Sequence, residues 1–567
     1  MCGIFALGKS DNNINNNYNV IEKAFNNGQP RGPEFTTLNT YDNLYMGFHR
    51  LAINGLNDES NQPFEINNTV MVCNGEIYNY KQLALENSIE LTTDSDCEIV
   101  IHLYLKYGIE YTLSILDGVF AIIIYDKNEN QLIVARDPYG VRPLYYYIEK
   151  TTVSFASELK VLYELPFNKQ NIHHFEPGNF MIFSDINNIN NRHLNYNYKK
   201  YTSFPCSNIK YSSDTSLLLQ VELMDNIQDA VVKRVLGTTE RPVGCLLSGG
   251  LDSSLIAALV NKYYKSEIPL ETFSIGLPGS EDLKYAAIVA KHLGTKHHEI
   301  VVTEKEFFDP IPDVIRTIES YDTTTVRASV GNYLIGKYIK ENTNCKVIFN
   351  GDGADELMGG YLYFKKAPNA YEFDRECKRL LEDIHMYDVL RSDRCIASHG
   401  LEPRTPFLDK TWVEFYLTID RDLRYNTTKD KCEKYLLRNT FHMLADGLLP
   451  SEILWRTKEA FSDGVSSLTK SWFEIIQDNI IELFNVPNNN LHHELVTIIE
   501  KYKFSKSSIN KPTTYEQAYY RKLYNTFYPS TDHLIPYFWM PKYVDAKDSS
   551  ARTLKFYHED NTNKLIY

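Results

Sequence analysis

The chain has 567 residues and a net charge of −14 at neutral pH, with 43% hydrophobic and 23% charged residues. This length predicts several domains, and the composition is typical of a folded globular protein. An acidic chain without a basic block binds nucleic acid or anionic membranes poorly, so we expect neither as a partner. No apolar run is long enough to cross a membrane, and the chain begins without a secretory signal. The nine cysteines are scattered without CxxC spacing, which predicts reduced thiols and a cytoplasmic location.

Short β-branched and aromatic runs occupy the first part of the chain, as at 69–74, 119–125, 131–135 and 144–148. Asn, Gly and Asp separate them, and such a pattern predicts strands of antiparallel sheets. A helix is expected at 96–107, where apolar residues recur at helical spacing. We therefore expect an α+β arrangement in this part of the chain.

The pattern changes after a stretch rich in Asn, Tyr and Ser at 185–213, where we place a domain boundary. Helices are expected beyond it at 216–236, 252–264 and 283–293, and strands at 243–247, 271–275 and 298–302. This alternation predicts a parallel, doubly wound sheet. From about residue 375 the pattern is mostly helical, and the stretch after 530 is expected to wrap the surface.

Cys2 follows the initiator methionine and is the first candidate for chemistry. If Met1 is removed, this residue carries a thiol and a free α-amine, whose pKa of about 7.7–8.0 leaves a useful fraction neutral at neutral pH. The amine can then accept the thiol proton and generate the thiolate nucleophile without a separate histidine. The alternative is a cysteine that stands at the second position by accident.

Six motifs follow MCGIF in order and bear on this choice. They are RGPE at 31–34, GFHRLAI at 47–53, CNGEIYN at 73–79, SDCE at 95–98, RDPYGVRPLYY at 136–146 and FASE at 155–158. Together they resemble the class II glutamine amidotransferase domain, an N-terminal-nucleophile fold of two antiparallel sheets layered between helices. The resemblance covers residues 2–184. It departs from the family at Glu34, where Asp is usual, in a loop that we expect to be structural.

This resemblance implies roles for single residues. Cys2 attacks the side-chain amide of glutamine, and Asn74 with the backbone of Gly75 forms the oxyanion hole. Arg50 and Asp96 hold the α-carboxylate and the α-ammonium of glutamine, which suits a planar guanidinium and a carboxylate. The implied pocket is completed by Leu51, Ile53 and Glu76. The plain alternatives are a tight turn at Asn74 and a surface charge at Arg50.

A second candidate site begins where an apolar strand runs into SGGLDSS at 248–254 and then a helix. Strand, glycine turn and helix start form an anion site, because backbone N–H groups and the helix dipole face the ligand. The Walker pattern GxxxxGK[ST] is absent. The motif resembles instead the pyrophosphate loop of ATP pyrophosphatases, with a plain glycine-rich turn as the alternative. Asp252 in this loop and Asp355, in a second acidic loop after the strand at 346–349, are candidate ligands for Mg²⁺.

The two patterns joined in one chain narrow the function further. The second part also carries GLPGS at 276–280, ESYDTTTVRAS at 319–329, EPRTPFLD at 402–409, EKYLLR at 433–438, WRTKEAFSDGV at 455–465 and DSSARTL at 548–554. Together they resemble the glutamine-hydrolysing asparagine synthetase family along almost the whole chain. The resemblance implies an ATP-pyrophosphatase domain at 213–540, with a parallel sheet and a helical C-terminal part, and a tail at 541–567.

The implied reaction converts aspartate, ATP and glutamine into asparagine, AMP, pyrophosphate and glutamate, with Mg²⁺ as cofactor. The β-carboxylate of aspartate attacks the α-phosphorus of ATP, and ammonia released at Cys2 passes through an internal tunnel to β-aspartyl-AMP. A tunnel is needed because ammonia in neutral water becomes ammonium and loses its nucleophilic lone pair. The resemblance allows a homodimer, and the sequence leaves the oligomeric state open.

Lys458 matches the cation that stabilises the adenylation transition state, where negative charge accumulates on phosphate; the alternative is a solvated surface lysine. The resemblance assigns ATP contacts to Leu246, Ser248, Gly249, Gly250, Asp252, Ser253, Ile275, Asn350 and Gly351. Arg327 is a candidate ligand for pyrophosphate or aspartate. Two residues depart from the family: Asn350 replaces the commoner Ser, and Asp352 replaces the commoner Glu at a candidate catalytic position.

Three other readings remain open at this point. β-Lactam synthetases share the architecture but lose the catalytic cysteine, which is intact here. Amidotransferases such as the one that makes glucosamine 6-phosphate share the first part and carry sugar-phosphate domains in place of SGGLDSS. A non-catalytic glutamine sensor is the option outside enzymes, and intact chemistry at both sites speaks against it.

Overall fold

The computed structural model describes residues 1–9, 18–186, 194–207, 209–210, 216–425, 432–459, 461–467, 470–484, 495, 498 and 509–554. Of the predicted tail at 541–567, residues 555–567 lie outside this set, as do parts of the predicted boundary at 185–213. No helix within the described ranges is long and apolar enough to span a membrane.

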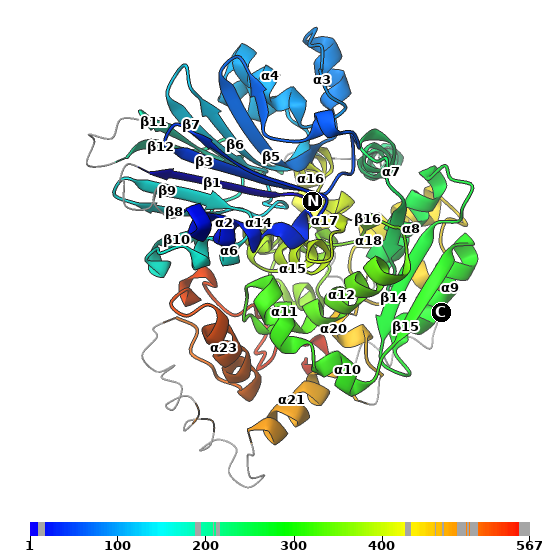
Figure 1. Ribbon diagram of the computed structural model, residues 1–567. Coiled ribbons are helices and arrows are strands. Elements are labelled where there is room, and N and C mark those ends of the chain that lie inside the picture. Colours follow the sequence, from blue (N-terminus) through cyan, green and yellow to red (C-terminus); the bar gives the residue numbers. More distant parts are fainter. Residues whose placement is uncertain are drawn as a thin grey trace.

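Two six-stranded antiparallel sheets make up the first part of the molecule (Figure 1). The first has the order β10-β8-β9-β1-β3-β2, with β1 at Gly3–Lys9, β2 at Phe35–Tyr41, β3 at Leu44–Arg50, β8 at Tyr145–Glu149, β9 at Thr152–Ala156 and β10 at Ile172–His174. The second has the order β12-β11-β7-β6-β5-β4, with β4 at Phe64–Ile66, β5 at Thr69–Ile77, β6 at Gly118–Asp126, β7 at Gln131–Arg136, β11 at Asn179–Ser184 and β12 at Asn195–Lys200.

Strand β5 shows how these sheets are layered. Val70 and Val72 belong to the apolar cluster between the two sheets, whereas Met71 and Cys73 belong to a cluster shared with helices on the outer face. Successive side chains of a strand point to opposite faces, so an apolar residue at every position is buried on both sides. The outer helices are α3 at Tyr80–Glu86, α4 at Glu98–Tyr107 and α5 at Ile109–Ile115 over one sheet, and α2 at Tyr18–Asn26 and α6 at Leu159–Glu164 over the other. The predicted sandwich of two antiparallel sheets between helices is confirmed.

The second part of the molecule is built on a five-stranded parallel sheet of order β15-β14-β13-β16-β17. Its strands are β13 at Val243–Leu246, β14 at Glu271–Gly276, β15 at Lys296–Val301, β16 at Val347–Phe349 and β17 at Glu402–Arg404. Helices α7 at Ser216–Val232, α8 at Leu251–Tyr263, α9 at Glu281–Leu293, α12 at Thr323–Asn342 and α15 at Asp388–Ala397 lie about it. The predicted parallel sheet is therefore confirmed, with the third expected strand beginning two residues earlier than predicted.

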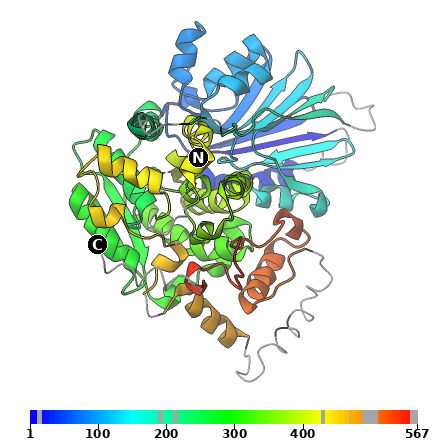
Figure 2. The same cartoon turned by 180° about the vertical axis from the view of Figure 1, so that it is seen from behind.

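Helices dominate the rest of the described chain, as the pattern after residue 375 indicates. They include α10 at Glu304–Phe308, α11 at Ile311–Ile318, α13 at Ala354–Met358, α14 at Ala370–Asp383, α16 at Lys410–Thr418, α18 at Tyr435–Leu444, α20 at Phe461–Gly464, α21 at Trp472–Leu483 and α23 at Tyr515–Phe527. In the views from the front and from behind, the amino end lies where the sandwich meets the second part (Figures 1 and 2). Cys2 is therefore placed at the junction of the two parts.

Two predictions of irregular chain need correction. Strand β12 falls inside the stretch 185–213, and all six of its residues are exposed, so its polar sequence carries no alternation of burial. The stretch after 530 was expected on the surface, but Leu534, Ile535, Trp539 and Leu554 are buried. These side chains follow no helix or strand period because only short helical turns form there, at 532–534 and 551–553.

Two candidate active sites

The first candidate site is a small cavity of about 30 Å³ at the start of β1. Its walls include Cys2, Arg50, Leu51, Ile53, Gly75, Glu76 and Asp96. The residues come from the ends of β3 and β5 and from the turn before α4. The structure thus brings together the predicted glutamine residues, which lie up to 94 positions apart in the sequence.

Asn74 lies directly beside the nucleophile. Its Oδ1 accepts a hydrogen bond from the backbone N of Cys2 at 3.0 Å. Its buried Nδ2 donates to no partner among the residues that the structure describes, although Asn74 itself is not among the residues that line the cavity. A side chain at Gly75 would place its Cβ 2.6 Å from the carbonyl oxygen of Val119, so only glycine fits between the strands. Burial raises the pKa of the Cys2 thiol, and its Sγ lies 3.8 Å from the carbonyl oxygen of Leu51.

Arg50 and Asp96 are both buried, so Arg50 is not a surface charge. The guanidinium of Arg50 donates to the carbonyl oxygen of Asn57 at 2.9 Å, to Oδ1 of Asn61 at 2.7 Å and to the carbonyl oxygen of Gly55. Asp96 accepts a hydrogen bond from the backbone N of Ile77 at 2.6 Å. Burial raises the pKa of Asp96 to about 6, and that hydrogen bond opposes the shift.

The wall that faces the second part of the molecule is charged. Arg404 of β17 lies 3.0 Å from Glu76 and 2.8 Å from Glu402. The amino group of Met1 donates to Oε2 of Glu402 at 3.0 Å, and Glu402 lines the cavity with Cys2. Burial, and then the nearby Glu402, raise the pKa of Glu76. We did not predict Glu402 or Arg404 as site residues, although both stand in the EPRTPFLD motif.

The second candidate site is a larger cavity of about 160 Å³ at the carboxyl ends of the parallel strands. Its walls include Leu246, Ser248, Gly250, Asp252, Ser253, Ile275, Asn350, Gly351, Asp352, Asp355 and Lys458. Every residue predicted for the ATP contacts is in this wall except Gly249, together with both candidate metal ligands and Lys458. Ligands of open α/β sheets bind at this edge.

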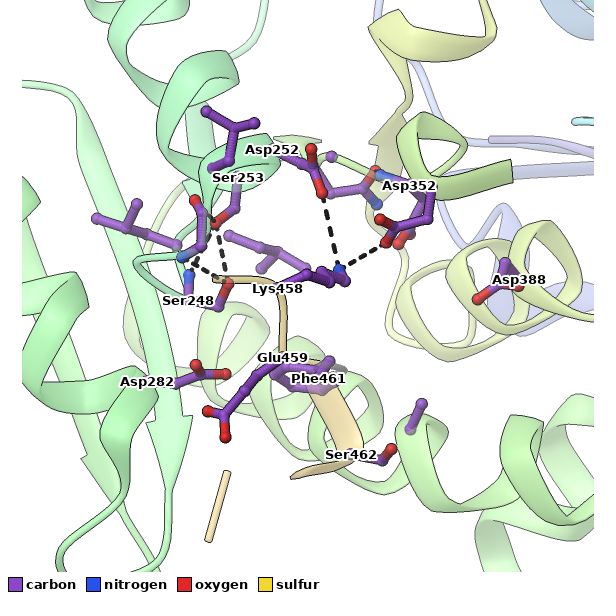
Figure 3. Close-up of a pocket in the computed structure, with 18 of the residues that line it drawn as sticks. Ser248, Asp252, Ser253, Asp282, Asp352, Asp388, Lys458, Glu459, Phe461 and Ser462 are labelled. Carbon is purple, nitrogen blue, oxygen red and sulfur yellow. Dashed lines mark hydrogen bonds and ion pairs between the residues drawn. The ribbon is translucent and has the colours of Figure 1, made fainter. Parts of the chain in front are cut away.

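The loop from Ser248 to Ser253 is shaped by close packing (Figure 3). Gly249 has a φ of +69°, and a Cβ there would lie 2.5 Å from the backbone N of Ala286 in α9. A Cβ on Gly351 would lie 2.9 Å from the backbone N of Ser253. Ser248 and Ser253 are joined by a hydrogen bond of 3.0 Å between their hydroxyls. Helix α8 begins at Leu251 without a side-chain cap, so its first N–H groups face the cavity wall unshielded.

Two acids and two lysines meet beside this loop. Nζ of Lys434 lies 2.6 Å from Asp252 and 2.5 Å from Asp355, and Nζ of Lys458 lies 2.5 Å from Asp355 and 3.7 Å from Asp252. Figure 3 shows Lys458 pointing into this acidic corner. The lysines hold the pKa of Asp355 well below its usual range, against the effect of burial. Lys458 is therefore paired and mostly buried, and it is not a solvated surface lysine.

Asp352 forms an ion pair of 3.0 Å with Arg391, which also contacts Asp388 at 2.9 Å. Asn350 holds the loop from the other side, because its Oδ1 accepts from the backbone N of Asp352 at 3.2 Å. Its Nδ2 donates to Oγ of Ser392 at 2.7 Å. The two departures from the family thus contact one another and helix α15.

Arg327 is not among the residues that line the cavity. Its guanidinium binds Glu516 of α23 through contacts of 2.8 and 2.6 Å, and Asp548 through contacts of 2.7 and 2.8 Å. Ser550, two residues further on, donates to Asp463 at 2.7 Å. Arg327 therefore ties the C-terminal segment to helix α12.

The residues of the second cavity that sequence reasoning missed include Lys434, Asp388 and Arg391. A signal existed only for Lys434, which stands in the EKYLLR motif beside a buried glutamate. Asp388 and Arg391 lie on α15, where a one-turn pair of opposite charges is ordinary for any helix. Their role depends on the approach of Asp352, which the sequence does not show.

Known protein families match both parts of the chain. The profile of the glutamine amidotransferase domain matches residues 1–207, and that of asparagine synthase matches residues 222–373 and 366–497. Asparagine synthetase [glutamine-hydrolyzing] of chicken is 41% identical over 580 residues, covering 98% of this chain and 99% of the relative. The proteins of the same name from cattle and human are 40% and 39% identical over 588 and 584 residues, with the same two coverages.

An amidotransferase sandwich joined to an asparagine synthase domain with a parallel sheet defines the chain as a glutamine-dependent synthetase. Identity of about 40% across nearly the whole length of these relatives then settles the family. The chain belongs to the glutamine-hydrolysing asparagine synthetases.

Proposed function

We propose that the chain makes asparagine from aspartate, ATP and glutamine through β-aspartyl-AMP, releasing AMP, pyrophosphate and glutamate. The observation that carries the proposal is the presence of two separate sites in one chain, a nucleophile cavity at Cys2 and a phosphate loop beside two aspartates and two lysines. Neither site can supply the chemistry of the other, because the first holds a thiol and the second has none among its lining residues.

In the first site, Cys2 attacks the amide carbon of glutamine. Removal of Met1 frees the nitrogen that already lies 3.0 Å from Asn74, and this amine accepts the thiol proton. Nδ2 of Asn74 and the backbone N–H of Gly75 then face the oxyanion, and the unpaired state of Nδ2 supports this role. Asp96 and Arg50 bind the two ends of the amino-acid group. Ammonia leaves as the thioester forms, and water later releases glutamate.

In the second site, the backbone of the Ser248–Ser253 loop binds the triphosphate and Leu246 and Ile275 contact the nucleoside. A carboxylate oxygen of aspartate attacks the α-phosphorus, and the bond to the pyrophosphate oxygen breaks. Lys458 stabilises the negative charge that builds up on phosphate in this step. Lys434 holds the two aspartates in place, because it contacts both.

Residues for Mg²⁺ are Asp252 and Asp355. Mg²⁺ usually takes one or two carboxylates from a protein and completes its shell with phosphate oxygens and water. Oδ1 of Asp252 is a buried acceptor without a hydrogen-bond partner among the described residues, which fits a ligand position. No group of three or more acidic, histidine or cysteine residues within the described ranges could hold a metal by itself. The ion, when bound with ATP, supplies positive charge to the leaving pyrophosphate.

Asp352, Asp388 and Arg391 in the cavity wall are the candidates to bind aspartate. Arg391 offers a guanidinium for the α-carboxylate, and Asp388 offers a carboxylate for the α-ammonium. Arg327 stays a predicted ligand of aspartate or pyrophosphate, although its four contacts to Glu516 and Asp548 favour a role in holding the C-terminal segment.

Ammonia passes between the sites inside the protein. Two observations support an internal route. Glu402, in the wall of the Cys2 cavity, lies on β17, and β17 pairs with β16, whose end carries Asn350 of the other cavity. The second observation is chemical: free ammonia in neutral water is protonated and no longer attacks the acyl-adenylate.

One assay tests the whole proposal. Purified protein is supplied with aspartate, ATP and Mg²⁺, with either glutamine or ammonium chloride, and asparagine and pyrophosphate are measured together. Equal amounts of the two products with either nitrogen source support the reaction. A protein that hydrolyses glutamine yet releases no pyrophosphate contradicts it. A cytoplasmic location and a homodimer stay predictions, which cell fractionation and sedimentation of the purified chain address.

A further inference from the structure

The RGPE loop at 31–34 is an amidotransferase motif to which the proposed chemistry gives no role, and its arginine has an unusual position. Arg31 is fully buried at the junction of the two parts of the molecule. Its Nε donates to the carbonyl oxygen of Cys2 at 3.0 Å. Its two terminal nitrogens bind Asp393 of α15 through contacts of 2.6 and 3.1 Å. A single guanidinium therefore joins the nucleophile residue to a helix of the other domain.

Helix α15 continues this connection into the second cavity. The residue before Asp393 is Ser392, which accepts a hydrogen bond from Asn350. One position earlier, Arg391 pairs with Asp352 in the cavity wall. From Cys2 to Asp352 the path thus consists of direct contacts between 2.6 and 3.1 Å, plus three consecutive helix residues. A packed path of this kind can carry a change at one site to the other.

We propose that Arg31 is a positioning residue that couples the two reactions: filling of the aspartate and ATP site orders α15, and the Arg31–Asp393 pair transmits this to Cys2. The inference rests on the proposed function. It adds a control to it: glutamine is hydrolysed faster when aspartate and ATP occupy the second site than when they do not. Without this control, the first site would hydrolyse glutamine even when the second site holds no aspartate and ATP to use the ammonia.

The geometry makes the arginine specific. A guanidinium binds a carboxylate through two parallel N–H donors and keeps Nε for a third partner, whereas a lysine has one nitrogen at one point. Only arginine can hold both oxygens of Asp393 and the carbonyl oxygen of Cys2 together. Glu158 adds a further contact at 3.2 Å, which keeps the positive charge compensated if Asp393 is neutralised.

The test uses Asp393→Asn, because Asp393 lines neither cavity. Glutamine hydrolysis is measured with and without aspartate, Mg²⁺ and α,β-methylene-ATP, which fills the second site without turnover. The parent protein is expected to gain about fivefold or more, at the lower end of typical couplings between sites. Asp393→Asn is expected to show a ratio near one, while its ammonia-dependent synthesis stays at the parent rate.

The matched control is Lys410→Gln. Lys410 also crosses the junction, donating to the carbonyl oxygens of Ser114 and Leu116, but it contacts neither cavity. Its gain is expected to equal that of the parent. If Asp393→Asn does not fold, Arg31→Lys replaces it, with ammonia-dependent synthesis as the check of folding.

Two outcomes overturn the coupling: a parent whose hydrolysis does not respond to filling of the second site, or an Asp393→Asn protein that keeps the full response. Failure of the proposed function itself gives a different result, since the parent then makes no asparagine from ammonia. Linkage applies to the binding part of the coupling: if aspartate and the ATP analogue tighten glutamine binding to the Cys2→Ala protein, glutamine must tighten aspartate binding by that same factor, and Asp393→Asn must abolish both effects.

Discussion

The two cavities of this chain are built in opposite ways. The first has about 30 Å³, and its predicted residues stand between positions 2 and 96, on the ends of neighbouring strands. The second has about 160 Å³ and draws residues from positions 246 to 462 on many elements. In the first, a thiol lies among backbone groups and buried charged side chains that are held by their own partners. In the second, two lysines neutralise two aspartates.

This difference indicates what each site does before its substrate arrives. Fixed donors such as Nδ2 of Asn74 need no rearrangement to meet an oxyanion, so the first site is organised in advance. In the second, Lys458 and Lys434 are bound to the same acids that would receive Mg²⁺ with the nucleotide. If the chain binds ATP with Mg²⁺ as proposed, binding would exchange the partners of Asp252, Asp355, Lys434 and Lys458 and would release Lys458 toward phosphate.

Loss of the nucleophile should separate the activities of the two cavities completely. Cys2→Ala is expected to abolish glutamine-dependent synthesis and to leave ammonia-dependent synthesis at the parent rate, because the second cavity contains no group of the first. Asparagine formed from each nitrogen source is the measurement. Cys206→Ala, at an exposed cysteine, serves as the matched control and should change neither rate. Loss of both activities in a folded Cys2→Ala protein would contradict the separation.

The converse change removes a charge from the second cavity, in the acid–lysine cluster of Asp252, Asp355, Lys434 and Lys458. Lys458→Ala should lower synthesis with either nitrogen source by about 10²-fold or more, because its charge meets the transition state directly. Hydrolysis of glutamine should stay at the parent rate. Lys470→Ala, at an exposed lysine twelve positions further on, provides the control. An unchanged rate of pyrophosphate release in Lys458→Ala would remove the residue from the proposed mechanism.

Asp252→Asn tests the magnesium position in the same cluster. An amide is a much weaker ligand of Mg²⁺ than a carboxylate. The rate of asparagine synthesis should therefore fall, and the Mg²⁺ concentration that gives the half-maximal rate should rise. The apparent affinity for Mg²⁺ at fixed ATP is the quantity to titrate. The residue is wrongly assigned if the variant needs no more Mg²⁺ than the parent and releases pyrophosphate as fast.

The contrast between the cavities also explains how far the sequence could be interpreted. The sandwich and the parallel sheet follow from short β-branched and apolar runs and from the βα alternation. A strand such as β5 is apolar at successive positions because it is buried on both faces. The glutamine residues stand in contiguous motifs, so each one is visible in the sequence. Gly249 is similar: its positive φ and the 2.5 Å approach of α9 explain why a glycine must stand there.

The residues that escaped prediction depend on long-range contacts. Arg391 becomes part of a site only because Asp352 approaches it from a loop 39 positions away. Glu402 becomes part of the first site only because β17 of the second part brings it into the same cavity wall as Cys2, 400 positions away in the sequence. Burial of Trp539 results from tertiary packing, which leaves no period in an irregular segment. Strand β12 is exposed at every position, so no apolar alternation marks it.

Asp352 is the residue where the second cavity departs most from its family. Asp352→Glu adds one methylene to a carboxylate already paired with Arg391 at 3.0 Å, and Asn350 fixes the backbone behind it. The longer acid should crowd the aspartate pocket and lower ammonia-dependent synthesis by up to about 10²-fold, the cost of misplacement by about 1 Å. Basal glutamine hydrolysis, measured without aspartate and ATP, should not change. Asp309→Glu, on an exposed helix end, is the control. A faster Asp352→Glu protein would mean that the native loop is not adjusted to the shorter acid.

The smallest expected effect is a pH dependence confined to the first cavity. Asp96 must be ionised to bind the α-ammonium of glutamine, and burial raises its pKa to about 6. The carboxylate is therefore present above pH 6 and is lost as the pH falls through that value. Affinity for glutamine should be constant near neutral pH and weaken about tenfold for each unit below 6, since one proton competes with binding.

Calorimetry with the Cys2→Ala protein measures this affinity without turnover. Groups that face Asp96 include Glu402, which raises its pKa, and Arg404 and the N–H of Ile77, which lower it. Glu76 lies in the same wall, and its pKa is also raised, so it contributes a titration of its own. The double variant Cys2→Ala/Asp96→Asn separates the two acids: it should bind glutamine weakly, and the tenfold step per unit near pH 6 should vanish. If that step persists without Asp96, Glu76 is the titrating group. If the affinity of the Cys2→Ala protein for glutamine stays constant down to pH 5, Asp96 does not hold the ammonium group of glutamine.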